Sequence, residues 1–228
     1  MIRTLSEVIA RHRRPILIVT AALVATTLLA RALGANPDTL APCLFLPFLT
    51  ADLLYLLTLV APSTRRRPDA FEVDGAGFHT PRTGGVTLVG VAHLCLVGAL
   101  ALDPSGTTPM GIPFSWALAI GVALLALYPR ALWHGVRLTI TPDGLRNDKY
   151  AGTVTIPWQS IAEINPTDST DQRLRLSLTS PDQVTVTGWT TSRRTLEFNG
   201  AGLPFVAATI RHYLNNPADR PHITTPPP

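Results

Sequence analysis

Residues 136–148 read VRLTITPDGLRND, in which apolar and polar side chains alternate on both sides of the turn signal Pro142-Asp143-Gly144. Alternation with a period of two predicts half-buried strands, and this turn composition predicts that the two strands form a hairpin. The stretch GTVTIP at residues 152–157 predicts a further strand. We therefore expect an antiparallel β-domain in the C-terminal part of the chain.

The pattern of alternation continues further along the chain. Leu174, Leu176 and Leu178 alternate with polar residues, and after a turn the alternation resumes at Val184 and Val186. These two runs predict an antiparallel hairpin with one buried face.

The last element has a different period. Apolar residues recur at intervals of three and four between Leu203 and Leu214, which predicts an amphipathic helix that ends at Asn215-Asn216-Pro217. We expect residues 217–228 to form a disordered tail.

Three segments of this region carry a resemblance: LTITPDGLRND from Leu138, IPWQSIAEI from Ile156, and YLNNPADR from Tyr213. Residues 136–216 resemble the bacterial pleckstrin-homology (PH-like) domains that are attached to membrane helices. The resemblance implies an α+β fold, a small β-barrel or sandwich capped by the C-terminal helix. It also implies an interaction or scaffolding module with a protein partner. We expect structural roles for Gly144 and for Trp158, which follows a proline after an alternating strand; for Trp158 a ligand platform is the alternative.

The preceding half of the chain has the composition of a membrane protein. Only 15% of the residues of the whole chain are charged, against roughly 25% in an ordinary soluble domain, and residues 83–102 and 104–129 contain no Asp, Glu, Lys or Arg. A bilayer core about 30 Å thick needs about 20 apolar helical residues. Four apolar stretches meet this requirement, and they predict two helical hairpins within residues 15–61 and 85–129: residues 15–33, 40–61, 85–102 and 111–128. For the first stretch a cleaved signal peptide is the alternative, but the run is long and no convincing cleavage site follows it.

Arginines predict the orientation of these spans, because Arg and Lys in short loops favour the cytoplasmic side. Residues 1–14, 62–84 and 130–137 together hold ten arginines, whereas the opposite side has only Arg31, which lies near the end of the first span. We expect a multi-pass protein of the bacterial cytoplasmic membrane with both termini in the cytoplasm. Residues 1–14 place apolar side chains on one helical face. This basic cytoplasmic segment is therefore either a helix that lies in the membrane interface or a solvated lead-in to the first span.

The predicted cytoplasmic loop at residues 62–84 contains a second strand–turn–strand pattern, FEVDGAGFHTPR from Phe71. At an offset of 67 positions it matches the hairpin quoted first, with Gly77 on Gly144 and Phe78 on Leu145. A degenerate duplication and coincidence both explain four matched positions. Because an isolated hairpin is marginal in water, we predict that residues 71–80 pack on or extend the C-terminal domain.

Two ionisable residues fall inside predicted spans, Asp52 in the second and His93 in the third. Both lie at similar depth, so they are expected to be able to meet inside the bundle as a candidate intramembrane polar pair. Such residues suggest a proton relay or ion site, and hence a small proton-coupled transporter. The alternative is a single hydrogen-bonded pair that holds two helices together.

Basic residues are the other candidate site, because a PH-like domain suggests sensing of anionic lipid. The candidate contacts are Arg65, Arg66, Arg67, Arg137, Arg146, Lys149, Arg193 and Arg194. For Arg65, Arg66 and Arg67 the alternative is that they only set the orientation of the spans in the membrane and bind no lipid. Residues 136–228 carry nine basic and eight acidic residues, so their charge predicts no nucleic-acid binding.

No sequence motif predicts catalysis. The chain has no phosphate loop, no nucleophile elbow and no zinc-ligand spacing. We therefore expect no enzyme activity, no cofactor and no metal, and a membrane-anchored interaction protein whose partner and oligomeric state the residues do not specify.

Overall fold

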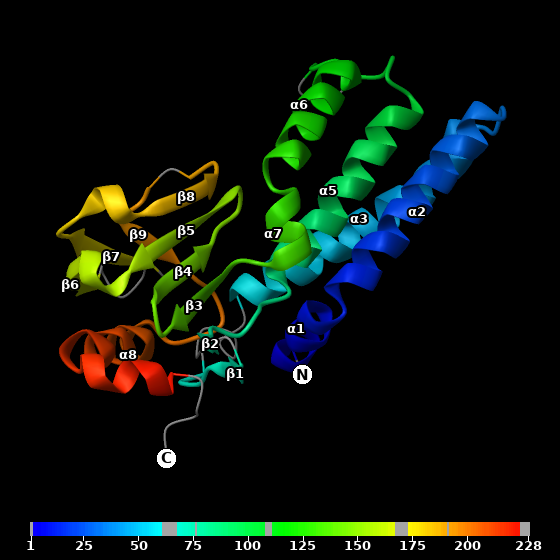
Figure 1. The fold of residues 1–228 in the computed structure, drawn as a ribbon. Coiled ribbons are helices and arrows are strands. Elements are labelled where there is room, and N and C mark those ends of the chain that lie inside the picture. The colour runs from blue at the N-terminus through cyan, green and yellow to red at the C-terminus, as the bar shows by residue number, and fades with distance from the viewer. Residues whose placement is uncertain are drawn as a thin grey trace. The chain divides into compact units, whose positions relative to one another are not determined.

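The computed structural model describes residues 2–60, 68–75, 77–107, 111–166, 173–190 and 192–223. The chain divides into two compact units (Figure 1). The helical unit contains Met1–Arg65 and Gly84–Trp133, and the β-unit contains Arg66–Thr83 and His134–Pro228. Each unit is therefore assembled from two separate segments of the chain.

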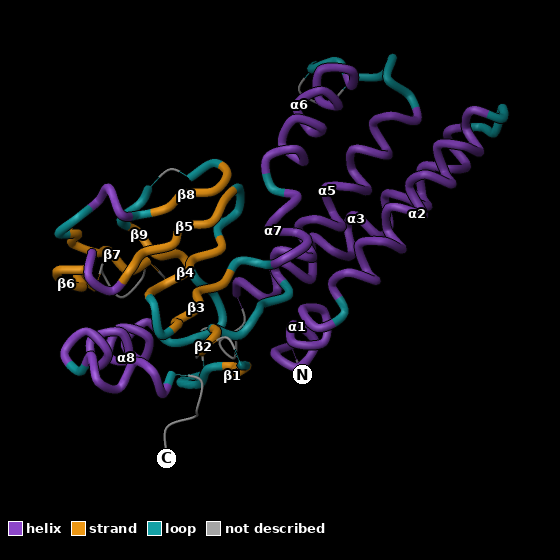
Figure 2. The backbone as a smooth tube through the Cα atoms, viewed as in Figure 1, coloured by secondary structure: helices purple, strands orange, loops and turns teal. Residues whose placement is uncertain are grey.

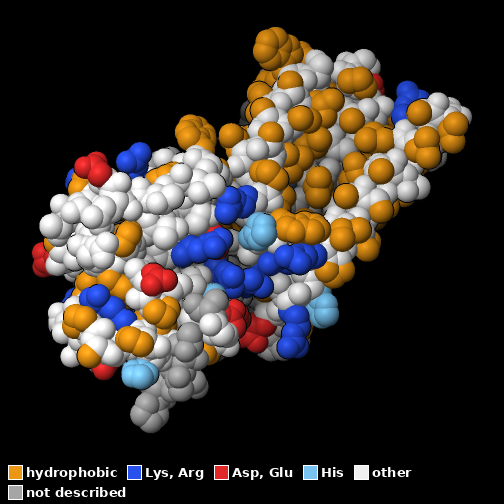
Figure 3. Space-filling model, viewed as in Figure 1, with side chains coloured by type: hydrophobic (Ala, Val, Ile, Leu, Met, Phe, Trp, Pro, Cys, Tyr) orange, Lys and Arg blue, Asp and Glu red, His pale blue; other side chains and the backbone are white. Residues whose placement is uncertain are grey.

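The helical unit is built around one central helix. Its elements are α1 (Ile2–Arg11), α2 (Arg13–Ala32), α3 (Pro37–Val60), α5 (Gly85–Leu102), α6 (Phe114–Leu127) and α7 (Pro129–His134) (Figure 2). Helix α5 packs against α2, α3 and α6, and it is the most buried of the long helices. Its glycines permit close contact, because a Cβ on Gly98 would lie 2.8 Å from the Val24 side chain. Hydrophobic side chains cover much of the unit's visible surface, as a lipid-facing bundle requires (Figure 3).

Three described helices, α2, α3 and α5, are long and apolar enough to cross a membrane, so the structure does not confirm the expected four. Helix α6 has only 14 residues, or about 21 Å of length. It stops at Tyr128 because the following Pro129 disfavours the helical conformation in the residue before it.

The β-unit consists of two antiparallel sheets. The first has the order β1-β2-β3-β4-β5-β8, and the second has the order β6-β7-β9. The strands are β1 (Glu72–Asp74), β2 (Gly77–His79), β3 (Arg137–Thr141), β4 (Gly144–Asp148), β5 (Gly152–Pro157), β6 (Ile161–Pro166), β7 (Arg173–Leu178), β8 (Thr185–Gly188) and β9 (Thr195–Glu197). Of the two expected forms, the arrangement corresponds to a sandwich; the described strands form no closed barrel.

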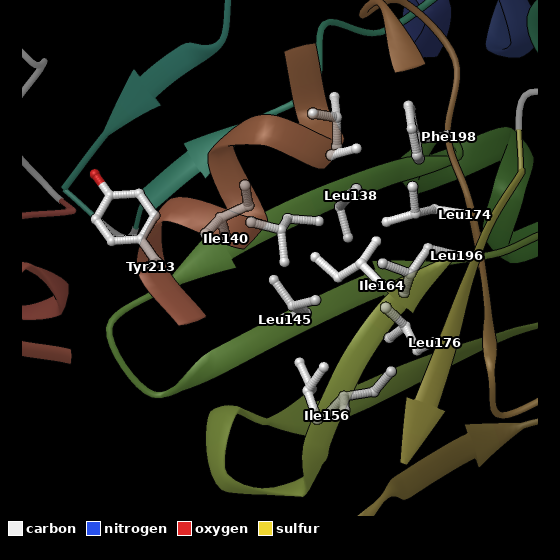
Figure 4. Close-up of a cluster of buried hydrophobic side chains, with 14 of the residues drawn as sticks. Leu138, Ile140, Leu145, Ile156, Ile164, Leu174, Leu176, Leu196, Phe198 and Tyr213 are labelled. Carbon is white, nitrogen blue, oxygen red and sulfur yellow. The ribbon is translucent and has the colours of Figure 1, made fainter. Parts of the chain in front are cut away.

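A single hydrophobic core lies between the sheets and the terminal helix α8 (Leu203–Asn215). Leu138 and Leu145 from the first sheet meet Leu174 and Leu196 from the second (Figure 4). Helix α8 packs on β6 and β7 and buries the stripe that its sequence predicted. The predicted terminal helix is therefore confirmed.

The buried side chain of Asn147 joins the two sheets. Its Nδ2 donates to the Glu197 carbonyl at 2.6 Å, and its Oδ1 accepts from the Glu197 N–H at 2.9 Å. Asn147 lies on β4 and Glu197 on β9. The Asn147 side-chain amide therefore makes, with the backbone of β9, the two hydrogen bonds that a neighbouring strand would make. This bridge fixes how the second sheet lies against the first.

The predicted hairpin between the Leu174 and Val184 runs is wrong. Strand β7 pairs with β6 and β9, whereas β8 pairs with β5 in the other sheet. A short 3₁₀ helix, Pro181–Gln183, follows β7 and redirects the chain. Val184 still faces the common core, but it does so from the opposite layer.

The prediction that residues 71–80 extend the C-terminal domain is confirmed. Strand β2 pairs with the outer edge of β3, and Phe78 joins the core. Moreover, the β1–β2 hairpin has the register of the β3–β4 hairpin displaced by 67 positions. The matching pairs are Val73 with Phe78 and Ile140 with Leu145, then Asp74 with Gly77 and Thr141 with Gly144. Equal register favours duplication over coincidence.

Gly77 and Gly144 also occupy equivalent close approaches. A Cβ on Gly77 would lie 2.2 Å from the Ile140 carbonyl oxygen, and a Cβ on Gly144 would lie 2.2 Å from the Ile156 oxygen. Each glycine begins the second strand of its hairpin, where the backbone of the next strand leaves no room for a side chain. Gly144 therefore has the structural position expected for it.

The expected disordered tail needs correction as far as Ile223. Residues 217–222 form a 3₁₀ helix, and Ile223 is fully buried in the core. Arg220 holds this segment on the domain, because its Nε donates to the Tyr213 carbonyl at 2.9 Å and its guanidinium stacks over Trp158. Residues 224–228 lie outside the described part of the chain.

The duplicated hairpin generates a first prediction. Gly77→Ala should destabilise the β-unit by about 1–3 kcal/mol, because the new Cβ collides with the Ile140 carbonyl in an unfavourable backbone conformation. Thermal unfolding of the purified full chain measures the effect. Gly75→Ala is the matched control, since a Cβ there meets nothing within 4 Å. Equal melting midpoints for the two variants would contradict the β2–β3 pairing.

Candidate interaction surface

The two ionisable residues of the predicted spans do not form the expected pair. His93 on α5 hydrogen-bonds through Nδ1 to the hydroxyl of Tyr128, which follows α6. Asp52 lies on an exposed face of α3. The described hydrogen bond of His93 therefore joins α5 to the end of α6 and not to Asp52, and the transporter hypothesis stays a prediction.

The basic residues of the first hairpin surround a buried carboxylate. Asp148 on β4 lies 3.4 Å from the Arg146 Nε and 3.9 Å from the Arg137 Nε, and it also accepts a 2.7 Å hydrogen bond from Thr153. Part of the positive charge is thus neutralised within the domain. Arg65, Arg66 and Arg67 lie outside the described residues.

Lys149 is not a surface residue, so its assignment as a lipid contact needs correction. Its side chain is buried, with the residue 4% exposed, and Nζ donates to the Ser192 carbonyl at 2.7 Å. Burial lowers the pKa of Lys149 below its usual range; nearby Glu197 opposes this effect and Arg173 adds to it. Lys149 instead ties the end of β4 to the segment that connects β8 and β9.

Trp158 is part of the core of the β-unit. It is buried, its indole Nε1 donates to the Thr141 carbonyl at 3.0 Å, and its ring contacts Tyr213 of α8. A tryptophan N–H in a core needs such a partner. Trp158 therefore connects the turn after β3 with the terminal helix.

One edge of the first sheet is open. Strand β8 is the last strand in the order, so within the described residues only β5 pairs with it. The run from Gln183 to Ser192 contains no charged residue. The opposite edge strand, β1, carries Glu72 and Asp74. Charged side chains protect exposed edges from pairing, so β8 is the less protected edge.

Exposed side chains gather where β8 ends. Trp189 follows β8 and is 68% exposed, and Tyr150 between β4 and β5 is 48% exposed. Arg193 and Arg194 are also exposed. The sequence analysis named the two arginines as candidate contacts but neither of the two aromatic residues. The uncharged run at residues 183–192, which contains Trp189, was the available sequence signal for this surface.

The family comparison agrees with this architecture. Residues 135–198 match the family model described as Bacterial PH domain, which covers β3 to β9. Over these residues the β-unit is thus similar to a bacterial PH domain, and the helical unit contains helices long and apolar enough to span a membrane. Searches of the curated proteins and of the solved structures returned no match.

The burial of Lys149 predicts a pH-dependent stability. Because its folded-state pKa is lowered, the unfolded chain binds more protons between that pKa and the unfolded value of about 10.4. Stability of the wild type should therefore rise with pH through this window. The melting midpoint of Lys149→Met relative to wild type should increase as the pH falls from about 10.4.

Arg146→Met is the matched control, since Arg146 lies on β4, the strand that ends just before Lys149, and its side chain is exposed. Its difference from wild type should not vary in this way. A Lys149→Met difference that stays constant with pH would contradict a charge penalty at Lys149.

Proposed function

We propose that the chain is a membrane-anchored adaptor whose PH domain binds a protein partner by adding a strand to the open edge of β8. The observation that carries this proposal is the uncharged edge of β8, which pairs only with β5 among the described residues, whereas the other edge strand of the same sheet, β1, carries Glu72 and Asp74. Strand addition supplies main-chain hydrogen bonds and requires no catalytic group. The proposed role is therefore binding and not catalysis.

The geometry of β8 determines which groups meet the partner. The Trp189 N–H donates to the Ala151 carbonyl at 3.0 Å, on the β5 side. Backbone polar groups alternate sides along an antiparallel strand. Val186 and Gly188 therefore direct their N–H and C=O groups to the outer edge, where a partner strand pairs with them.

The proposal includes four membrane crossings with both termini in the cytoplasm. Strands β2 and β3 lie in one sheet, so residues 80–136 start and finish on the same side of the membrane. Helix α5 supplies one crossing, and the return crossing falls to α6, the one described apolar helix of ten or more residues that follows α5. The arginine distribution supports a cytoplasmic β-unit.

This topology predicts the accessibility of the α5–α6 connection. A cysteine introduced by Ser105→Cys should react with a membrane-impermeant maleimide when the outer layer of the cells is permeabilised and the inner membrane is still closed. Thr187→Cys, in the β-unit, should react only after the inner membrane is opened. The unsubstituted chain gives the background from Cys43 and Cys95. Labelling of both variants under the same condition would contradict a return crossing by α6.

Site-specific photocrosslinking tests the binding edge. A benzoylphenylalanine at Thr187, in the full chain in native membranes, should give one discrete protein adduct. Thr185→Lys should remove most of it, because a strand that docks there must bury the new charge. Val73 lies exposed on the opposite edge of the sheet, so it serves as the matched position for the crosslinker and for a lysine.

The adduct at Thr187 should persist in the Val73→Lys variant. Equal adducts from Thr187 and Val73, or an adduct that survives Thr185→Lys, would contradict strand addition at β8.

A further inference from the structure

Helix α3 carries an unsatisfied carboxyl group on an exposed face. Asp52 is exposed, and among the described residues no hydrogen bond or ion pair engages its side chain. It lies eight residues before Val60, the last residue of α3, or about 12 Å along the helix. The short side chain of an aspartate does not reach the membrane surface from that depth, and a carboxyl group that faces lipid is costly. We therefore expect a polar group to meet Asp52 inside the membrane.

Other polar side chains at the exposed surface of the spans have partners within the chain. Thr50, also on α3, donates through Oγ1 to the Leu46 carbonyl at 2.8 Å. Arg31 at the end of α2 donates through Nε to the Leu102 carbonyl at 3.2 Å. Asp52 differs from both, because its partner has to come from outside the described part of the chain.

The residues around Asp52 have the spacing of a helix-pairing surface. Leu49, Asp52, Leu56 and Leu59 follow one another at intervals of three, four and three residues. The three leucines are 46%, 51% and 54% exposed. Alternating intervals of three and four keep side chains on one line of a left-handed helix pair. These four residues, which we call the α3 seam, all follow Pro47, the last internal proline of the helix.

We propose that the α3 seam pairs with the same seam of a second copy of the chain inside the membrane. The arginines orient every copy in the same way, so the two α3 helices are parallel and their Asp52 side chains lie at the same depth. A two-fold axis along the membrane normal then places each seam residue opposite its own counterpart. A different membrane protein would need a polar group at this depth, whereas a second copy supplies one by symmetry.

The two Asp52 carboxyl groups satisfy each other in such a pair. A protonated carboxyl donates through its O–H and a carboxyl oxygen accepts, so one shared proton is enough to join them. The leucines alone do not select this face, because lipid tails are as apolar as leucine. A polar pair in an otherwise apolar seam selects it, and also fixes the register of the two helices.

Pairing through α3 gives the chain two binding edges. A dimer holds two β8 strands on one side of the membrane, so a partner that offers two strands binds with a raised effective concentration. The pairing itself does not depend on strand addition at β8.

Cysteine crosslinking of the full chain in native membranes tests the seam. In a chain with Cys43→Ala and Cys95→Ala, the single new cysteine is Leu56→Cys on the seam or Leu57→Cys next to it. Both leucines are exposed, 51% and 43%, so their accessibility is matched. Oxidation should give about fivefold more covalent dimer from Leu56→Cys, because a disulfide requires Cα atoms within about 7 Å. Co-expression of two tagged forms identifies the product as two copies of this chain.

Substitutions of Asp52 in the Leu56→Cys chain test the polar pair. Asp52→Leu should lower the dimer yield by about three- to tenfold, because it removes an interhelical hydrogen bond. Asp52→Asn should keep the yield, since an amide also donates and accepts. Thr50→Leu is the matched control, because Thr50 is an exposed polar residue of the same helix whose hydroxyl is already bound within the chain. Its yield should equal that of the unsubstituted seam.

Three outcomes would overturn the proposal: equal dimer yields from Leu56→Cys and Leu57→Cys, a yield that does not respond to Asp52→Leu, or a covalent product that contains a different protein. A variant that fails to insert is absent from the membrane fraction, and the comparison of Leu56→Cys with Leu57→Cys does not depend on it. The partner adduct at Thr187 is scored separately, so failure of helix pairing and failure of strand addition give different results.

Discussion

The pairing of β2 with β3 is the constraint on which the rest of the structure depends. It closes the outer edge of β3, places Phe78 in the core, and makes one domain from segments that lie on both sides of the α5–α6 hairpin in sequence. A sheet built across a membrane hairpin requires that hairpin to enter and leave on the same face. On the proposed topology, the pairing of β2 with β3 therefore requires α6 to return the chain to the side of the membrane from which α5 started.

The register of the two hairpins suggests how such an arrangement arose. In each half a pair of helices precedes a β-hairpin, and the two hairpins pair with equal register at an offset of 67 residues. The second half continues through β5 to β9 and α8, whereas the first half ends after β2. The first hairpin then adds its strands to the edge of the second, which satisfies the backbone groups of β3 and leaves β8 as the less protected edge.

Local patterns predicted the elements well, and the partners between elements less well. Alternation and turn residues identified β3, β4 and β5, and the three-and-four spacing identified α8. Alternation shows that a strand has a buried face but not which sheet it joins, so the Leu174 and Val184 runs were assigned to one hairpin although they belong to two sheets. Equal depth likewise does not determine rotation about a helix axis, which is why Asp52 was matched to His93. Lys149 resembled a surface charge because its carbonyl partner lies 43 residues away.

Hydrogen–deuterium exchange of the full chain in nanodiscs tests the β2–β3 pairing most directly. The Thr80 N–H donates to the Leu138 carbonyl at 2.9 Å, at the junction of the two chain segments. We predict that peptides covering residues 77–80 exchange as slowly as those covering β3 and β4, and that both lose protection together when the β-unit unfolds. Fast exchange of residues 77–80 alongside a protected β3 would contradict a single domain built from both segments.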